Sequence, residues 1–463
     1  MKPVPFRETD GLLDDEIRAG LEELADDDAA QGEIIPIPSA TPWPEPLHHA
    51  ALRGLPGDIV RAVGPHSEAD PVGILVSTLG RYGITVGRSP HCVVGSTRHG
   101  VNENFLLIGS TSQGRKGTAE NDAEALFKLA GDDCHVPTTW GLGSGEGLVN
   151  AIRDEVKKVR VTKVRGGGTA TEEYVAEDGV EDKRLLVREA EFAHPLRVSK
   201  REGSVLSPII RLAFDGCDLR ITTRNTPLRA TDPHVGIMGH IVPDELRDLL
   251  SDTDVESGFG NRFIFIAVRR SKLLPNVTPV PPEVAVPLAA RLREAVGFGM
   301  AVGEMHRDAT AEELWTKLYH VLAQDRPGLA GALLARAHAH VVRLSMLYAL
   351  LDRSIVIKRT HLESAAALWS YAEASVRYVF GDMLRDRRAE ELVTAIRNAG
   401  PKGLKREDIR DLFSRNLSSP RIDLMLGELA RQGLAHGRKA KDGKVGRPSE
   451  RWYAGPAPEV PPC

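Results

Sequence analysis

Residues 105–118 read FLLIGSTSQGRKGT, and they lead into AENDAEALFKLA, a stretch of good helix formers. An apolar strand therefore runs into a glycine-rich turn, and the turn leads into a helix. Such a turn directs backbone N–H groups at an anion, and the partial positive charge of the helix N-terminus adds to the attraction. The sequence predicts a phosphate-binding loop here.

This loop departs from the usual phosphate-loop pattern G-x-x-x-x-G-K-[ST], because Arg115 precedes the lysine and Gly117 separates Lys116 from Thr118. We expect Lys116 to neutralise the β- and γ-phosphates of ATP and Thr118 to ligate Mg²⁺. The predicted nucleotide-binding residues of the loop are Gly109, Ser112, Gln113, Gly114, Arg115, Lys116, Gly117 and Thr118. The alternative is a basic glycine-rich turn that binds no nucleotide.

Short apolar runs alternate with helical stretches on either side of the loop, over residues 101–300. We expect strands at 105–108, 184–187, 235–238 and 263–268, and helices at 117–130, 145–157, 201–213 and 243–251. This alternation is typical of a mostly parallel sheet with helices on its faces. Segment 158–183 interrupts the pattern with three consecutive glycines and many charges, which indicates a hairpin or a mobile insertion.

The remaining segments suggest flanking helical regions and a small C-terminal unit. Residues 1–46 read as an acidic arm and a proline-rich linker, 47–100 as a helical layer and 301–385 as a helical subdomain. Residues 386–455 contain three amphipathic helices and then a two-stranded hairpin around Asp442-Gly443, the pattern of a winged helix-turn-helix. Residues 456–463 form a tail.

Composition excludes several classes of protein. The chain has 463 residues, 41% of them hydrophobic and 27% charged, which is enough for two or three cores. No apolar run approaches the roughly 20 residues that span a bilayer, and the four cysteines are far apart without a CxxC pair. We expect a cytoplasmic protein with no membrane contact. Since the formal net charge is -4, contact with DNA requires local basic patches.

Two segments offer the acids that an ATPase needs. Glu146 lies in the glycine-rich segment TTWGLGSGEG, where it is a candidate general base; alternatively, it only caps the next helix. Glu189 follows the apolar run RLLV, where a carboxylate on the metal side is expected, although Glu191 is two residues on and shares the same face if the strand continues. We favour Glu189, with an acid of a surface edge strand as the alternative.

Two further residues are candidates for contact with the γ-phosphate. His240 ends the run HVGIMGH and could sense the phosphate, although a single histidine at a strand end is often structural. Arg262, in GFGNRFIF, could act as an arginine finger in a neighbouring subunit, with Arg269 and Arg270 as second choices. The alternative for Arg262 is an ion pair within its own chain.

The C-terminal hairpin is strongly basic. Its cations are Arg438, Lys439, Lys441, Lys444, Arg447 and Arg451, against two acids. Basic side chains on a hairpin after a helix-turn-helix pattern suit contacts with DNA phosphates. The alternative is a winged helix that binds another protein.

Taken together, these motifs resemble a phage- and plasmid-associated family of RecA-like P-loop ATPases of the primase–helicase or replication-protein type. The resemblance rests on GSTSQGRKGT, GLGSGEGLVNAIRD, EDKRLLVREAEFA, LSPIIRLAFDG, HVGIMGHIVPDEL, GFGNRFIFIAVRRSKLLP and RAHAHVVRLSMLYALLD. It covers a little over half of the chain, residues 105–352. It departs from the family in the spacing of the phosphate loop and in the glutamate that replaces the usual aspartate.

The resemblance implies a RecA-like core that uses ATP and Mg²⁺, with Lys116 and Thr118 at the phosphates and metal and with Glu146 and Glu189 as catalytic acids. It implies a DNA-dependent ATPase of helicase or translocase type, acting in the replication of a phage, plasmid or other mobile element. We expect a ring-forming homo-oligomer, with a hexamer as one candidate, and a separate primase. Segments 158–183 and 215–229 are candidates for touching DNA. The alternatives are a DNA-binding regulator, or a defence or assembly subunit with a switch-like or degenerate nucleotide site.

Overall fold

A computed structural model of the chain describes residues 43–111, 114–164, 168–222, 227–250, 254–255, 257–324, 326, 328–381, 387–415, 417–431, 433–440 and 449–455. The predicted acidic arm, most of its linker and the tail lie outside these residues. Among the described helices, none is long and apolar enough to cross a membrane.

A parallel sheet of five strands forms the centre of the fold. In spatial order these are β11 (Ile264–Ala267), β3 (Phe105–Ile108), β10 (His234–Ile241), β7 (Arg184–Glu189) and β4 (Thr138–Trp140), and every neighbouring pair is parallel. All residues of β3, β10 and β11 are buried, as expected for strands that are covered on both faces. The predicted α/β class with a parallel sheet is confirmed.

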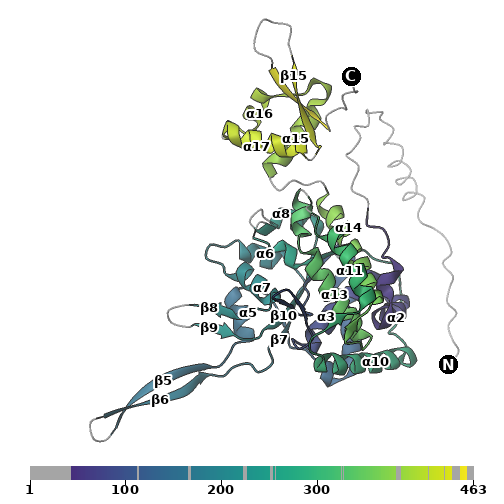
Figure 1. The fold of residues 1–463 in the computed structure, drawn as a ribbon, viewed down its shortest axis with the longest axis vertical. Coiled ribbons are helices and arrows are strands. Elements are labelled where there is room, and N and C mark those ends of the chain that lie inside the picture. The colour runs from purple at the N-terminus through teal and green to yellow at the C-terminus, as the bar shows by residue number, and fades with distance from the viewer. Residues whose placement is uncertain are drawn as a thin grey trace, which may run out of the picture. The chain divides into compact units, whose positions relative to one another are not determined.

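The central strand β10 shows how helices cover the two faces of the sheet (Figure 1). Met238 faces α3 (Pro71–Val86), where a Cβ on Gly80 would lie 2.7 Å from the methionine sulfur. His240, two residues on, faces α4 (Lys116–Ala130). Gly239 points to the other face and packs against Phe192, which precedes α6 (Ala193–Ser199). The helix α7 (Leu206–Phe214) also contacts β10.

The segments predicted as a helical layer, an ATPase core and a helical subdomain share one hydrophobic core, which extends from Ala51 to Phe380. Before the sheet lie η1 (His49–Leu52), α2 (Gly54–Val63), η2 (Gly64–His66), α3 and a short hairpin, β1 (Cys92–Val94) with β2 (Thr97–His99). After the sheet lie α10 (Pro282–Ala301), β12 (His306–Arg307), α11 (Ala309–Leu322), α12 (Gly328–Leu333), α13 (Ala337–Leu351), β13 (Val356–Ile357) and α14 (Arg359–Phe380). Tyr371 of α14 donates a hydrogen bond to the Ala267 carbonyl of β11 at 2.8 Å, which ties the last helix to the sheet.

The segment between β4 and β7 contains the predicted insertion. The helix α5 (Gly145–Ala151) ends six residues earlier than expected, and β5 (Val156–Val164) begins instead. Recurring valines from residue 156 onward favour a strand over a helix. β5 pairs antiparallel with β6 (Gly168–Glu177), so the predicted hairpin is confirmed.

The other expected helices lie close to their predicted places, with corrected starts. Between β7 and β11 the chain forms α6, α7, a short hairpin of β8 (Leu219–Ile221) and β9 (Leu228–Ala230), and α8 (Pro243–Leu249). The helix predicted at 201–213 begins only at Leu206, and α8 matches the helix predicted at 243–251. A short turn, η5 (Gly260–Arg262), precedes β11.

Residues 387–455 form a second hydrophobic cluster. It contains α15 (Arg387–Ala399), η6 (Gly400–Lys402), β14 (Leu404–Lys405), α16 (Arg406–Leu412), α17 (Ser419–Arg431), β15 (Ala435–Ala440) and β16 (Ser449–Ala454). The three strands form an antiparallel sheet in the order β14-β16-β15. Leu392, Ile409, Leu429 and Trp452 are among the side chains buried between helices and sheet. The three helices and the hairpin expected here are present, and the expected turn at Asp442-Gly443 lies outside the described residues.

Candidate functional site

The phosphate loop, Glu189 and His240 lie at one edge of the sheet, whereas Arg262 precedes β11 and lies at the opposite edge. Because all five strands are parallel, their carboxyl ends meet at a single edge, where open α/β sheets bind ligands. β3 leads into Gly109, β10 ends just after His240, and β7 ends at Glu189. The edge strand β4 leads into the loop 141–144, which begins with Gly141 and Leu142.

The described part of the phosphate loop is shaped by its glycines. The Gly109 N–H donates to the Ile241 carbonyl at 3.2 Å, and a Cβ on Gly109 would lie only 2.3 Å from the Val268 carbonyl oxygen. Gly109 is therefore required by the close passage of the chain after β11. The buried Gly114 donates its N–H to Ser110 and Thr111 carbonyls at 3.3 and 3.2 Å. Ser112 and Gln113, two predicted contacts, lie outside the described residues.

The N-terminus of α4 is open to an anion. Arg115, the residue before the helix, has a φ of 47° and provides no side-chain cap, so the first-turn N–H groups of Lys116, Gly117 and Thr118 have no partner from a capping side chain. Gly117 is exposed, and a Cβ there would meet nothing within 4 Å. A helix of 15 residues also carries the partial positive charge that favours an anion at this end.

Two basic side chains flank this helix end. The Lys116 Nζ donates to the Gly109 and Ser110 carbonyls at 2.7 and 2.9 Å, and burial lowers its pKa. The guanidinium of Arg115 lies 2.6 Å from a carboxylate oxygen of Glu68, which binds it away from the loop. Uncapped amides, a lysine over the loop and open space fit a phosphate group. A magnesium ion accompanying it would have the Thr118 hydroxyl and the phosphate oxygens as ligands.

A buried cluster that was not predicted lies beneath the loop, on the face of the sheet that α4 covers. Glu120 of α4 accepts a 3.0 Å hydrogen bond from Nε of Arg188 and lies 2.9 Å from a second guanidinium nitrogen, and Arg188 also binds Glu124 at 2.7 Å. His240 lies 3.5 Å from the second oxygen of Glu120, and neither of these facing atoms has another hydrogen-bond partner among the described residues. Burial opposes the ionisation of Glu120, but His240 and Arg188 outweigh it and hold its pKa below the usual value.

Glu189 lies at the end of β7 and is only 5% exposed, whereas Glu191 is exposed beyond the strand. The structure therefore distinguishes the two acids. One carboxylate oxygen of Glu189 accepts a hydrogen bond from the Leu142 N–H. Burial raises the pKa of Glu189, against the hydrogen bond to Leu142, which lowers it.

Strand alternation puts Glu189 and Arg188 on opposite faces of the sheet. Since Arg188 bonds to α4, Glu189 faces away from that helix. The metal role predicted for Glu189 is not supported by this arrangement, because its carboxylate is bound to a backbone amide and a cation occupies the α4 side. The catalytic role that the resemblance implies for Glu189 stays a prediction. Glu146 is exposed in the first turn of α5, and the side chain that caps this helix is Ser144, so the capping alternative is not borne out and the role of Glu146 as general base stays a prediction.

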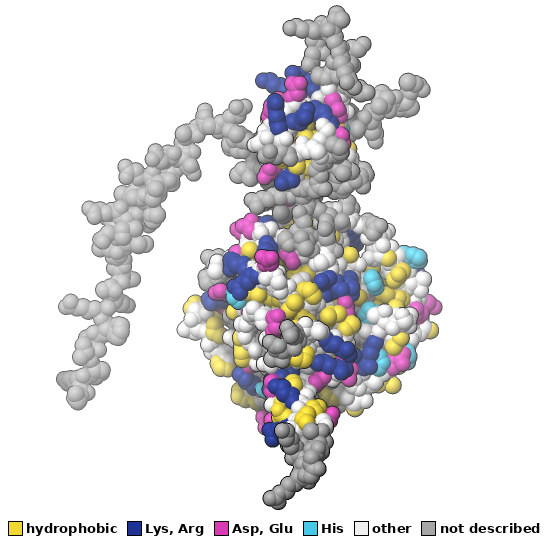
Figure 2. All heavy atoms as spheres, turned by 90° about the vertical axis from the view of Figure 1, so that its left-hand side faces the viewer, with side chains coloured by type: hydrophobic (Ala, Val, Ile, Leu, Met, Phe, Trp, Pro, Cys, Tyr) yellow, Lys and Arg dark blue, Asp and Glu magenta, His cyan; other side chains and the backbone are white. Residues whose placement is uncertain are grey.

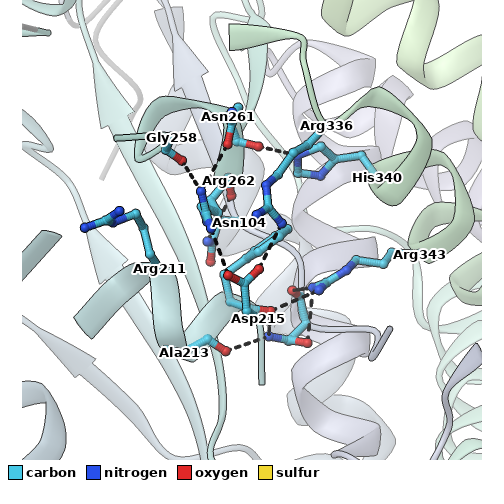
Figure 3. Close-up of polar contacts among 12 residues, drawn as sticks. Asn104, Arg211, Ala213, Asp215, Gly258, Asn261, Arg262, Arg336, His340 and Arg343 are labelled. Atoms are coloured by element: carbon cyan, nitrogen blue, oxygen red, sulfur yellow. Dashed lines mark hydrogen bonds and ion pairs between the residues drawn. The ribbon is translucent and has the colours of Figure 1, made fainter. Parts of the chain in front are cut away.

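Arg262 is bound within its own chain, as the alternative reading had it (Figure 3). Its side chain is 10% exposed, and its guanidinium lies 2.8 Å from Asp215 and donates to the Gly258 carbonyl at 2.6 Å. Asp215 also pairs with Arg336 at 2.9 Å. A finger that reaches a neighbouring subunit would have to break these bonds, so the predicted role of Arg262 is not supported. Arg269 is exposed, with its guanidinium 4.9 Å from the Trp43 ring, and Arg270 lies 3.8 Å from Glu68.

Of the predicted DNA contacts, Arg438 is described best. It is exposed on β15, directly opposite Arg451 of β16, and its guanidinium lies 5.7 Å from the Tyr453 ring. Arg451 also donates a hydrogen bond to the Lys402 carbonyl at 2.8 Å. Lys439 pairs in register with Glu450. Lys441, Lys444 and Arg447 lie outside the described residues.

Glu120, Arg188 and the amide of Leu142 were not predicted from the sequence. The alternation within RLLVRE could have indicated that Arg188 and Glu189 face opposite ways, since a buried strand has a period of two. Glu120 could have been noticed two residues after Thr118, in the first turns of the helix. Nothing in the sequence pairs residue 142 with residue 189, because that contact depends on how β4 and β7 are aligned.

No protein-family model matches the chain, and a search of curated proteins found no significant match. The resemblance to RecA-like ATPases of phages and plasmids therefore stays a prediction that rests on the sequence motifs.

Proposed function

We propose that this protein is an ATP-hydrolysing enzyme of RecA-like type that acts on DNA as a helicase or translocase. The observation that carries the proposal is the uncapped N-terminus of α4 at the carboxyl edge of a parallel sheet, with Lys116 beside it. The amides of residues 116–118 and the Lys116 ammonium would hold the phosphates, and Thr118 would hold magnesium. Bound Mg-ATP would supply a phosphoanhydride bond whose cleavage releases energy.

The strand order supports this proposal. In open α/β sheets, ligands bind at the carboxyl ends of the strands, so residues that end neighbouring strands can share one site. Here β10 separates β3 from β7, the strand that ends at Glu189. His240 ends the intervening strand, where a residue that responds to the γ-phosphate would be placed.

Glu189 is the residue we assign to activating water. Its raised pKa makes it a better proton acceptor than an ordinary glutamate, provided that the pH is high enough to ionise it. In the described structure the Leu142 amide binds its carboxylate. Glu189 would act once this hydrogen bond opens and a water molecule replaces the amide.

Contact with DNA is proposed from the basic surfaces. The C-terminal helices and antiparallel sheet occur in the order of a winged helix, with Arg438 and Arg451 opposite each other on its hairpin. Such a module would hold DNA through phosphate contacts, whose strength falls steeply with salt.

A nucleotide-dependent switch is the second candidate. On the face of the sheet that α4 covers, β7 carries the cation Arg188 where a carboxylate near the metal was expected. The neighbouring Glu189 carboxylate is bound to a backbone amide. An enzyme of this kind would bind ATP but hydrolyse it slowly, and its DNA binding would depend on the nucleotide.

Steady-state ATP hydrolysis by the full chain, with and without single-stranded DNA, tests the proposal. Lys128→Ala is a matched control for Lys116→Ala, because Lys128 is an exposed lysine at the other end of α4. The motor proposal expects DNA-stimulated turnover that Lys116→Ala abolishes and Lys128→Ala preserves. Negligible turnover with ATP still bound would favour the switch, and turnover that Lys116→Ala leaves unchanged would refute both.

A further inference from the structure

The β5–β6 ribbon is exposed on both faces. Figure 1 shows the ribbon projecting from the core, on the side that also carries α5 and the β8–β9 hairpin. Its valines at 159, 161 and 175 are 56, 63 and 47% exposed. A two-stranded ribbon without a third strand or a helix beneath it is only marginally stable in water. Its length and exposure therefore suit an element that is covered when a partner binds.

Charges on this side of the molecule point to an anionic partner. β5 carries only basic charged residues, which are Lys157, Lys158, Arg160 and Lys163. On the neighbouring hairpin, Arg220 of β8 lies directly opposite Arg229 of β9, and the two side chains are 61 and 52% exposed. The Asp218 carboxylate lies 3.4 and 3.3 Å from these two guanidiniums, and the Asp154 carboxylate lies 3.8 Å from that of Arg229.

The arginine pair is unfavourable by itself. Like charges directly opposite on two strands repel. Asp154, the second acid near Arg229, is also bound by the Lys183 ammonium, so the two acids leave net positive charge here. β6 contributes the acids Glu172, Glu173 and Glu177, so the ribbon as a whole carries charges of both signs. The β8–β9 hairpin carries the two opposed arginines. Figure 2, which views this side, shows Lys and Arg side chains gathered in groups among hydrophobic ones. Phosphates of a DNA backbone, spaced along a strand, match such separated cations.

The ribbon and the hairpin are joined at their base by hydrogen bonds to Asp154. Asp154, just before β5, accepts a 2.7 Å hydrogen bond from the Lys183 ammonium, in the segment that joins β6 to β7. The same carboxylate accepts hydrogen bonds from the N–H and hydroxyl of Thr231, which follows β9, both at 3.1 Å. The Asp154 N–H in turn donates to the Arg229 carbonyl at 2.7 Å. Both hairpins are therefore linked to Asp154, so a displacement of either one would move this residue.

This base is joined directly to the groups that hold Glu189. Going back along the chain, Asp154 follows α5, and α5 follows the loop whose Leu142 amide binds the Glu189 carboxylate. Going forward, Lys183 is the residue immediately before β7, the strand that ends at Glu189. The helix α5 also contacts both β8 and β9. Both partners of the Leu142–Glu189 hydrogen bond are thus attached to the base of the two hairpins, from opposite ends of the insertion.

We infer that the β5–β6 ribbon and the β8–β9 hairpin form one surface for the phosphate backbone of DNA, and that binding there moves the loop 141–144 and frees Glu189 from the Leu142 amide. The inference rests on the proposed function, in which Glu189 activates water. On this inference, DNA controls ATP hydrolysis by binding to the two hairpins and not by binding to the C-terminal module.

Amide hydrogen exchange of the full chain tests the inference without nucleotide. The Leu142 N–H is protected while it donates to Glu189, so binding of DNA at the hairpins should raise exchange in a peptide covering residues 138–147. The probes are a single-stranded oligonucleotide and a duplex of equal length, which identify the form of DNA that acts. The test variant is Arg220→Ala/Arg229→Ala. The control is Arg291→Ala/Arg353→Ala, two exposed arginines that each pair with a single acid elsewhere.

The expected result is faster exchange on adding DNA in the parent and the control, and no change in the test variant. Loss of two phosphate contacts should also reduce the slope of log affinity against log salt by about 1.4 for a single strand and about 1.8 for a duplex. Exchange that DNA leaves unaltered in the parent, or alters equally in the test variant, overturns the inference. Failure of the proposed function would instead appear as ATP binding or turnover that ignores Lys116→Ala, whatever the exchange result.

Discussion

Replacing Arg188 with methionine should lower the stability of the core strongly, because it leaves buried carboxylates without their cation. The guanidinium makes contacts of 3.0 and 2.9 Å with Glu120 and 2.7 Å with Glu124. The Arg188 and Glu120 side chains are 13 and 7% exposed. Removing one partner of a buried pair costs about 3–5 kcal/mol. Since Glu124 keeps Lys128 at 3.1 Å, we expect the lower end, about 3 kcal/mol.

The measurement is urea unfolding of Arg188→Met beside Arg197→Met, whose surface pair with Glu245 has side chains 56 and 44% exposed and should contribute less than about 1 kcal/mol. Adding Glu120→Gln to Arg188→Met should restore much of the loss, because the unpaired charge is then gone. The low pKa of Glu120 means that its ionisation stabilises the fold above its ordinary pKa of 4.5, and this stabilisation is lost as the pH falls through the lowered value. The cost of Arg188→Met should therefore shrink in acid. Equal losses for Arg188→Met and Arg197→Met would refute the reasoning.

Three further predictions concern the phosphate loop, Arg262 and Glu189. The Cβ of Gly109→Ala would lie 2.3 Å from a backbone carbonyl oxygen, so this variant should lower the free energy of unfolding by about 1–3 kcal/mol. The Cβ of Gly117→Ala would meet no atom within 4 Å, so that variant should leave the free energy of unfolding unchanged or raise it. Thermal melting of the two variants measures both changes. Arg262→Ala should lower the free energy of unfolding in urea. A mixture of Arg262→Ala and Lys116→Ala subunits should hydrolyse no more ATP than the two variants do separately. Greater hydrolysis in the mixture would show that Arg262 acts as a finger in a neighbouring subunit. Because the pKa of Glu189 is raised, its ionised, water-activating form should appear only above the ordinary value of 4.5, so the acid limb of a kcat–pH profile should lie above that value and vanish in Glu189→Gln.

The fold was predictable where local pattern determines the structure. The order of strands and helices around the phosphate loop followed from apolar runs and glycines, and β3, β10 and α4 begin or end within a few residues of their expected places. The helix expected at 145–157 failed in its second half. In that half, the charged residues are compatible with a helix but the repeated valines favour a strand. Pairing with β6 stabilises the strand.

The site was less predictable, because its decisive contacts join residues far apart in the chain. Arg262 finds Asp215 at 47 residues' separation, and Glu189 finds the amide of Leu142 at the same separation. Residue type indicated that both side chains could serve catalysis. Only the alignment of the strands shows that one is bound in an internal ion pair and that the other faces away from α4.

The central claim is that the N-terminus of α4 holds a triphosphate, and calorimetric titration of the full chain with Mg-ATP tests it most directly. A charge-assisted hydrogen bond contributes about 1.5–3 kcal/mol, so Lys116→Ala should weaken binding roughly tenfold to a hundredfold. Lys128→Ala, at the far end of the same helix, should bind as the parent does. Binding that is absent from the parent, or unchanged in Lys116→Ala, would contradict the account.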